Sequence, residues 1–395
     1  MPNSSSSRDR MLAALSCQSP DHPPCSFMIF GALHQRAENY LNFVARELDL
    51  GLDAFVMLPP RPPFPYNDHY NLHGLPVSYH SEVSVDEQVL HPVDEPEPVI
   101  VKTYHTPTGD LTARVRQTND WRWGNHVPFL DDFIIPRSTK FIVENIDDLD
   151  AFQYLLEEPT PAEIEAFRQS SGPAISFARD RDLLLTGGWG VGADMIGWVH
   201  GLETLVYDVY DRPDFVQALL SMIADWNRLR MAVVLDAGVD LYIKRAWYEN
   251  TDFFTPQTWE KLILPVLAQD AELAHQADAK FGYIITARAM PLLNLIAEAG
   301  VDVLIGVDPE AFDLEETKRT LGGKVCLWGG VNGHLTVEQG TPEAVRNEVK
   351  TALQSLGPDG FILSPVDNVR EDTPMAMRNV RTLIQTWRDQ TGQDH

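Results

Sequence analysis

Charged, polar and aromatic side chains follow the short apolar segments of this chain, at the points where predicted strands end. They are Lys244, Arg245, Tyr248, Glu249, Arg288, Asp308, Trp328, Asn332, His334 and Asp367. Arginine presents a planar fork that suits a carboxylate or a phosphate. A carboxylic acid whose pKa is raised by burial can act as a general acid or base. The pattern predicts a site for a small anionic molecule, with Glu249 and Asp367 as the candidate catalytic groups.

The other eight residues are candidate substrate-binding groups, and five of them have a structural alternative. Because a strand alternates its faces, Lys244 and Arg245 cannot both point inward, and Arg245 is the favoured one. The cations Lys244, Arg245 and Arg288 could instead hold loops in place. They would then form ion pairs with Glu249, Asp308 or Asp367. Asp308 could equally cap a turn, and His334 could lie on the surface.

These residues require a fold that gathers strand ends at one place. Apolar strand-like runs begin near residues 25, 53, 183, 240, 283, 303, 324 and 360, and each is followed by a helix or a long loop. Eight such units predict an α/β fold, the (β/α)8 barrel, in which the loops after the strands hold the chemistry. An open doubly wound sheet is the alternative, but no glycine fingerprint follows the first run.

Residues 59–180 interrupt this alternation. Residues 59–97 are rich in proline, histidine, tyrosine and acids. The runs 98–104 and 111–116 flank the turn TPTGD, which predicts a β-hairpin. We therefore expect one barrel domain, residues 1–395, with 59–180 as an elaboration after the second strand.

Composition excludes several classes of partner. A net charge of −26 makes nucleic acid and anionic membranes poor partners. The three cysteines form no CxxC pair, and no stretch approaches the length of a membrane span. A cytoplasmic protein is expected, and the oligomeric state stays open.

Several stretches together resemble the uroporphyrinogen decarboxylase superfamily. They include FFTPQTWEKLILPVL, PLLNLIAEAGVDVL, KVCLWGGVNGHLTVEQGTPEAVRNEV and DGFILSPVDNVREDTPMAMRNV, with RMLAALSCQSPDHPPCSF and LGLDAFVM near the start. The resemblance implies a (β/α)8 barrel. The superfamily includes porphyrinogen decarboxylases and corrinoid- or zinc-dependent methyltransferases, so the reaction is left open.

Departures from the decarboxylase pattern are informative. The family's arginine-rich run after the first strand is replaced by FMIFGALHQRAEN, and its aspartate after the second strand by Pro59 and Pro60. The family's late histidine corresponds to about Asp367. The resemblance therefore implies that the porphyrinogen machinery is missing.

The zinc site of some methyltransferase members is also unmatched. Their histidine and cysteine, two residues apart before PLL, correspond to Ile284 and Thr286, which are poor zinc ligands. We expect no tightly bound zinc and predict no metal ligands.

Three functions remain open. The first is a methyltransferase that moves a methyl group between a small anionic substrate and a corrinoid carried by a partner protein. The second is a decarboxylase-like lyase acting on a polycarboxylate. The third is a barrel that binds its ligand without turnover.

Overall fold

A curved sheet of parallel strands forms the centre of the molecule. The computed structural model describes residues 5–60, 71–72 and 74–393. Within them, seven strands pair in the order β1 (Phe55–Leu58), β8 (Leu184–Gly190), β9 (Leu241–Arg245), β10 (Lys280–Ile284), β11 (Val303–Val307), β12 (Cys326–Asn332) and β13 (Phe361–Val366).

An extended segment, residues 25–29, lies between the two edge strands of this sheet. Cys25 and Ile29 form parallel bridges with Leu363 of β13 and with Asn368 just after it. On the other side, the Asp53 amide donates to the Cys25 carbonyl at 2.8 Å, just before β1. We call residues 25–29 the closing segment, because it takes the place of the eighth strand. The (β/α)8 class is confirmed, although the expected first strand is bridged at only two points.

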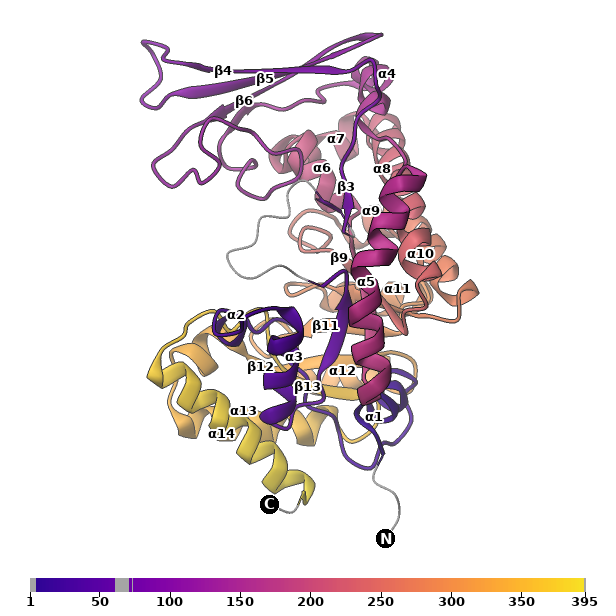
Figure 1. Cartoon of the computed structure of the whole chain (residues 1–395), viewed down its shortest axis with the longest axis vertical. Helices are drawn as coiled ribbons and strands as arrows, with labels where there is room; N and C mark the ends of the chain where they lie inside the picture. The colour runs from indigo at the N-terminus through magenta and orange to yellow at the C-terminus, as the bar shows by residue number, and fades with distance from the viewer. Residues whose placement is uncertain (1–4, 61–70, 73, 394–395) are drawn as a thin grey trace.

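Helices and short helical turns lie between and around the strands, most of them on the outside of the parallel sheet (Figure 1). They are α1 (Ser7–Leu15), α2 (Gly31–His34), α3 (Tyr40–Asp49), η1 (Ile146–Asp148), α4 (Leu149–Phe152), η2 (Gln153–Leu155), α5 (Pro161–Arg181), α6 (Ala193–Val199), α7 (Leu202–Asp211), α8 (Pro213–Asp236), α9 (Pro256–Leu262), α10 (Leu264–Gln276), η3 (Met290–Leu292), α11 (Leu293–Glu298), α12 (Leu314–Leu321), η4 (Gly333–Glu338), α13 (Pro342–Leu356) and α14 (Pro374–Thr391).

Capping residues in the local sequence determine where α13 and α14 begin. The Thr341 and Thr373 hydroxyls accept hydrogen bonds from the amides of Ala344 and Ala376, and a proline occupies the first position of each helix. Such caps satisfy amides that have no partner within the helix. The Thr-Pro starts predicted for these helices are confirmed.

Residues 59–180, which we call the interruption after β1, include a second, antiparallel sheet. Its strands are β4 (Ser84–Leu90), β5 (Val99–Thr106), β6 (Gly109–Arg116) and β7 (Ser138–Lys140), and β2 (Asn71–Leu72) pairs separately with β3 (Leu75–Pro76). The predicted hairpin is β5–β6, and Figure 1 shows it far from α13 and α14. Part of the expected excursion, residues 61–70 and 73, lies outside the described residues. That 1–395 form one domain stays a prediction.

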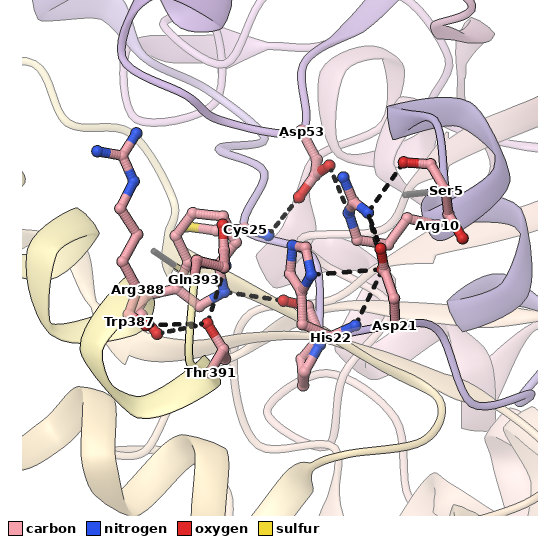
Figure 2. Close-up of polar contacts among 11 residues, drawn as sticks. Ser5, Arg10, Asp21, His22, Cys25, Asp53, Trp387, Arg388, Thr391 and Gln393 are labelled. Carbon is pink, nitrogen blue, oxygen red and sulfur yellow. Dashed lines mark hydrogen bonds and ion pairs between the residues drawn. The ribbon is translucent and has the colours of Figure 1, made fainter. Parts of the chain in front are cut away.

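A buried carboxylate joins the closing segment to the N-terminal helix (Figure 2). Asp53 accepts hydrogen bonds from the Cys25 amide and from Arg10 Nε, both at 3.0 Å. Arg10 also donates to Asp21 at 2.7 Å. Burial raises the pKa of Asp53, and Arg10 opposes that shift. This ion pair therefore holds the point where the barrel closes.

Arg10→Leu should lower the free energy of unfolding by about 3 to 5 kcal/mol, because it leaves the Asp53 carboxylate buried and unpaired. Arg36→Leu is the control, since Arg36 pairs with Asp372 at a partly exposed surface position. It should cost below about 1 kcal/mol. Chemical denaturation measures both, and equal losses would show that the Asp53 pair has no special part in closure.

Candidate active site at the barrel mouth

A pocket with indole walls lies at the carboxyl ends of the parallel strands. It encloses about 340 Å³ of empty space, part of it open to solvent, and Trp189, Trp247 and Trp328 line it. The first two rings meet edge to face, with centroids 6.4 Å apart. Trp328 is buried, and its Nε1 donates to the Ser26 carbonyl at 2.9 Å. The aromatic walls suit a largely apolar group.

Asp367 is the only charged side chain among the described residues that line this pocket. It follows β13 directly, in a left-handed conformation with φ of 66°. Burial raises the pKa of its carboxyl group, and Arg370, 3.3 Å away, opposes the shift. Asp367 can therefore accept a hydrogen bond from a ligand, or donate one when it is protonated.

Lys244 and Glu249 belong to a buried network beside the mouth. Lys244 Nζ donates to Asp270 at 2.7 Å, and Glu249 accepts from Tyr283 Oη at 2.5 Å and from the Ala193 amide at 2.7 Å. Burial raises the pKa of Glu249, and Lys244 opposes this. Glu249 is fully buried and does not line the pocket. Its predicted catalytic role therefore gains no geometric support.

Gly192, just before α6, lets the start of that helix lie close to Glu249. A Cβ at Gly192 would lie 2.5 Å from Glu249 Oε1 and 2.9 Å from Lys244 Nζ. The glycine-rich stretch after β8 thus lets the start of α6 contact the carboxylate through the Ala193 amide.

Arg245 is buried and paired with two carboxylates. Its Nε donates to Asp194 at 2.8 Å and its Nη2 to Asp132 at 3.1 Å, while its guanidinium lies 4.0 Å from the Trp247 ring centroid. Tyr248 Oη also donates to Asp132, at 3.1 Å. Because Asp132 belongs to the interruption after β1, Arg245 and Tyr248 attach that segment to the barrel.

Each of the three cations predicted to bind an anionic substrate has a carboxylate partner in the structure, and the binding role stays a prediction. The three cations are already neutralised by carboxylates: Lys244 by Asp270, Arg245 by Asp194 and Asp132, and Arg288 by Asp252 at 3.0 Å. The alternative of structural ion pairing fits better, although none of these partners is among the three that the sequence suggested. Arg288 is 73% exposed and does not line the mouth pocket.

Asp308, Asn332 and His334 form a neighbouring polar group. Both Asp308 oxygens accept from Asn332 Nδ2, at 3.1 and 3.0 Å, and Asp308 also accepts from the Glu310 amide. His334 is 65% exposed and pairs with Glu338 at 2.9 Å. These contacts favour turn capping for Asp308 and a surface position for His334.

The described residues 5–60, 71–72 and 74–393 contain no group of three His, Cys, Asp or Glu side chains placed to hold a metal ion. Ile284 and Thr286 line the mouth pocket, where zinc ligands would have been needed. The expectation of no tightly bound zinc stays a prediction.

Sequence reasoning missed Trp189 and Trp247 in the wall of the pocket. Trp247 lies two residues after the end of β9, and Trp189 lies near the end of β8. An aromatic residue at or just after the end of a predicted strand is the sequence signal that could have identified both tryptophans. Asp132 and Asp194 carry no comparable signal, because their partners are distant in sequence.

A barrel whose strand ends surround a small pocket is typical of enzymes. Residues 183–390, more than half of the chain, match the family model described as uroporphyrinogen decarboxylase (URO-D). The chain belongs to the URO-D family.

The chain is similar to solved structures at low sequence identity. A methyltransferase from Methanosarcina mazei is 17% identical, with a TM-score of 0.59 over 97% of this chain and 98% of that one. A B12-independent methionine synthase from Shewanella sp. W3-18-1 is 12% identical, with a TM-score of 0.48 over 94% and 97%. No curated protein matches the chain. Among the described residues, no helix has the length and apolar character needed to cross a membrane.

Arg245→Met should lower the free energy of unfolding by about 3 to 5 kcal/mol, because Asp194 is fully buried and would lose its cation. Arg288→Met should change it by less than about 1 kcal/mol, since that pair is exposed. Denaturation curves of the two variants give the comparison. A stable Arg245→Met protein would mean that the guanidinium is available to a ligand.

Proposed function

We propose that this chain is an enzyme that transfers a methyl group from a small methylated substrate held in the mouth pocket. The observation that carries the proposal is the pocket wall, three indole rings with a single carboxyl group. Such a wall suits an apolar methyl-bearing group together with one hydrogen-bonding group. The fold shared with a solved methyltransferase supports the same choice.

In this proposal the chain holds and orients the substrate. The rings of Trp189, Trp247 and Trp328 would contact the methyl-bearing part and exclude water from it. Asp367 would accept a hydrogen bond from the substrate and fix its direction. Because Lys244, Arg245 and Arg288 are ion-paired, we propose an uncharged or cationic substrate in place of the anionic one expected from the sequence.

A corrinoid on a partner protein is the proposed methyl acceptor. The empty space of the mouth pocket, about 340 Å³ with its solvent-open part included, is too small for a macrocycle, so the partner would have to present the corrinoid at the rim. When bound there, the corrinoid supplies a cobalt centre that takes the methyl group.

The two alternatives are less well supported by the geometry. A lyase acting on a polycarboxylate needs cations that face its substrate, and the described wall of the mouth pocket contains none. A binding barrel without turnover would use the same indole walls, so only an assay separates it from the enzyme.

The assay mixes the full chain with reduced free cobalamin and a panel of small methylated compounds, and follows the absorbance of methylcobalamin. Turnover is expected with at least one uncharged or cationic compound. Affinity without turnover would favour the binding barrel. Anaerobic formation of coproporphyrinogen from the reduced tetrapyrrole would favour the lyase and overturn the proposal.

Trp247→Leu should lower kcat/KM by roughly tenfold or more, equivalent to about 1.4 kcal/mol, because the substrate loses one aromatic wall. Trp123→Leu is the matched control, since Trp123 lies in the interruption after β1 and does not line the pocket. Equal effects of the two substitutions would show that the mouth pocket is not where the substrate binds.

A further inference from the structure

A second cavity lies behind the closing segment, under α2 and α3. It encloses about 550 Å³ of empty space, part of it open to solvent. Five aromatic side chains line it: Phe27, Phe30, Tyr40, Phe43 and Phe55. Met28 and Ile29 line both this cavity and the mouth pocket, so the closing segment separates the two. We call this cavity the aromatic chamber.

One carboxyl group, that of Glu47, lines the aromatic chamber. Glu47 lies on the buried face of α3 with Tyr40 and Val44, and it is only 3% exposed. Its carboxyl group forms no hydrogen bond or ion pair with any described residue, and burial raises its pKa well above the ordinary value. Burying an ionised carboxylate without a partner is costly. By contrast, the buried Glu249 has Tyr283 and the Ala193 amide as donors.

The surroundings of Glu47 select the charge of a ligand. No lysine or arginine lines the chamber within the described part of the chain. The titratable groups that line it beside Glu47 are His34, from α2, and Tyr40, from α3 itself; the closing segment, β1 and Asn368 contribute none. Aromatic rings carry negative charge on their faces and attract organic cations. A carboxylate among such rings favours a cation over an anion or a neutral molecule.

The side chains that line the chamber favour an organic cation over a metal ion. A metal ion needs several oxygen or nitrogen ligands, and the described residues offer no such group here. An alkylated ammonium ion needs one counter-charge and apolar contact around its alkyl groups. Ile29, Gly31, Phe43 and Asn368 are partly exposed at the edge of the chamber, which provides an entrance.

We propose that the aromatic chamber binds a small alkylammonium ion, with Glu47 as its counter-ion and the aromatic rings around its alkyl groups. The proposal concerns binding and holds whether or not the barrel transfers methyl groups. Binding of the cation would favour the ionised form of Glu47, because a nearby positive charge lowers the pKa that burial raises.

The test compares choline with 3,3-dimethylbutan-1-ol, an uncharged analogue of the same shape, by calorimetric titration of the full chain. We expect choline to bind at least about tenfold more tightly, a difference of about 1.4 kcal/mol. Glu47→Gln should remove this preference and leave the affinity for the alcohol unchanged. Equal affinities in the wild type, or an unchanged preference in Glu47→Gln, would overturn the proposal.

Two further variants localise the effect. Phe43→Leu removes one ring at the edge of the chamber and should weaken choline binding severalfold. Glu348→Gln is the matched control, because Glu348 is a half-buried acid with a raised pKa that contacts Asn332 outside the chamber. Loss of choline binding in Glu348→Gln would show that general charge, and not Glu47, attracts the cation.

The pH dependence gives an independent check. The folded chain holds a proton on Glu47 at pH values where the unfolded chain has lost it, so wild-type stability should fall relative to Glu47→Gln as the pH rises from 5 to 8. Choline carries a fixed charge, so its stabilisation of the wild type should grow over the same range. Melting temperatures of both proteins with and without choline measure this. A choline effect that is independent of pH would contradict the role of Glu47.

Discussion

The fold depends on backbone hydrogen bonds that the closing segment makes on both of its sides. An open parallel sheet would expose unpaired amides and carbonyls along β1 and β13. The Ser26 amide donates to the Leu363 carbonyl at 3.0 Å, and the Cys25 carbonyl accepts from Asp53. Trp328 adds a bond from inside the barrel to the Ser26 carbonyl. Since both cavities share Met28 and Ile29 as a wall, closure also defines the two candidate binding sites.

A second constraint is the pairing of charges that are buried beside the mouth. Buried cations require carboxylates at hydrogen-bond distance, and Lys244 and Arg245 obtain them from α10 and α6. The pairs leave the wall of the mouth pocket aromatic, with Asp367 as its charged group. A protein with a net charge of −26 thus presents a largely apolar pocket, because its inner cations and anions cancel locally.

The sequence predicted those features that depend on neighbouring residues. Apolar runs gave the strands of the barrel, Thr-Pro pairs gave the starts of α13 and α14, and TPTGD gave the β5–β6 hairpin. The site was predicted less well, because ion partners depend on the folded chain. Arg245 and Asp132 are 113 positions apart, so no local pattern connects them. Glu47 escaped notice for a related reason: its position in an amphipathic helix is apparent only when the packing of α3 is known.

Asp132 is shared by three donors from the barrel: Trp198 Nε1 at 2.9 Å, Arg245 Nη2 and Tyr248 Oη. It stands on the segment that carries the antiparallel sheet, between β6 and β7, while its donors belong to α6, the end of β9 and the loop after β9. These hydrogen bonds therefore contribute both to the attachment of the antiparallel sheet and to the local structure of the barrel. By thermodynamic linkage, if a ligand at the mouth strengthened these contacts, strengthening the contacts would favour that ligand by the same free energy. A change in the antiparallel sheet that moves Asp132 would therefore alter its contacts with Arg245 and Tyr248, so the sheet is coupled to the barrel as well as attached to it.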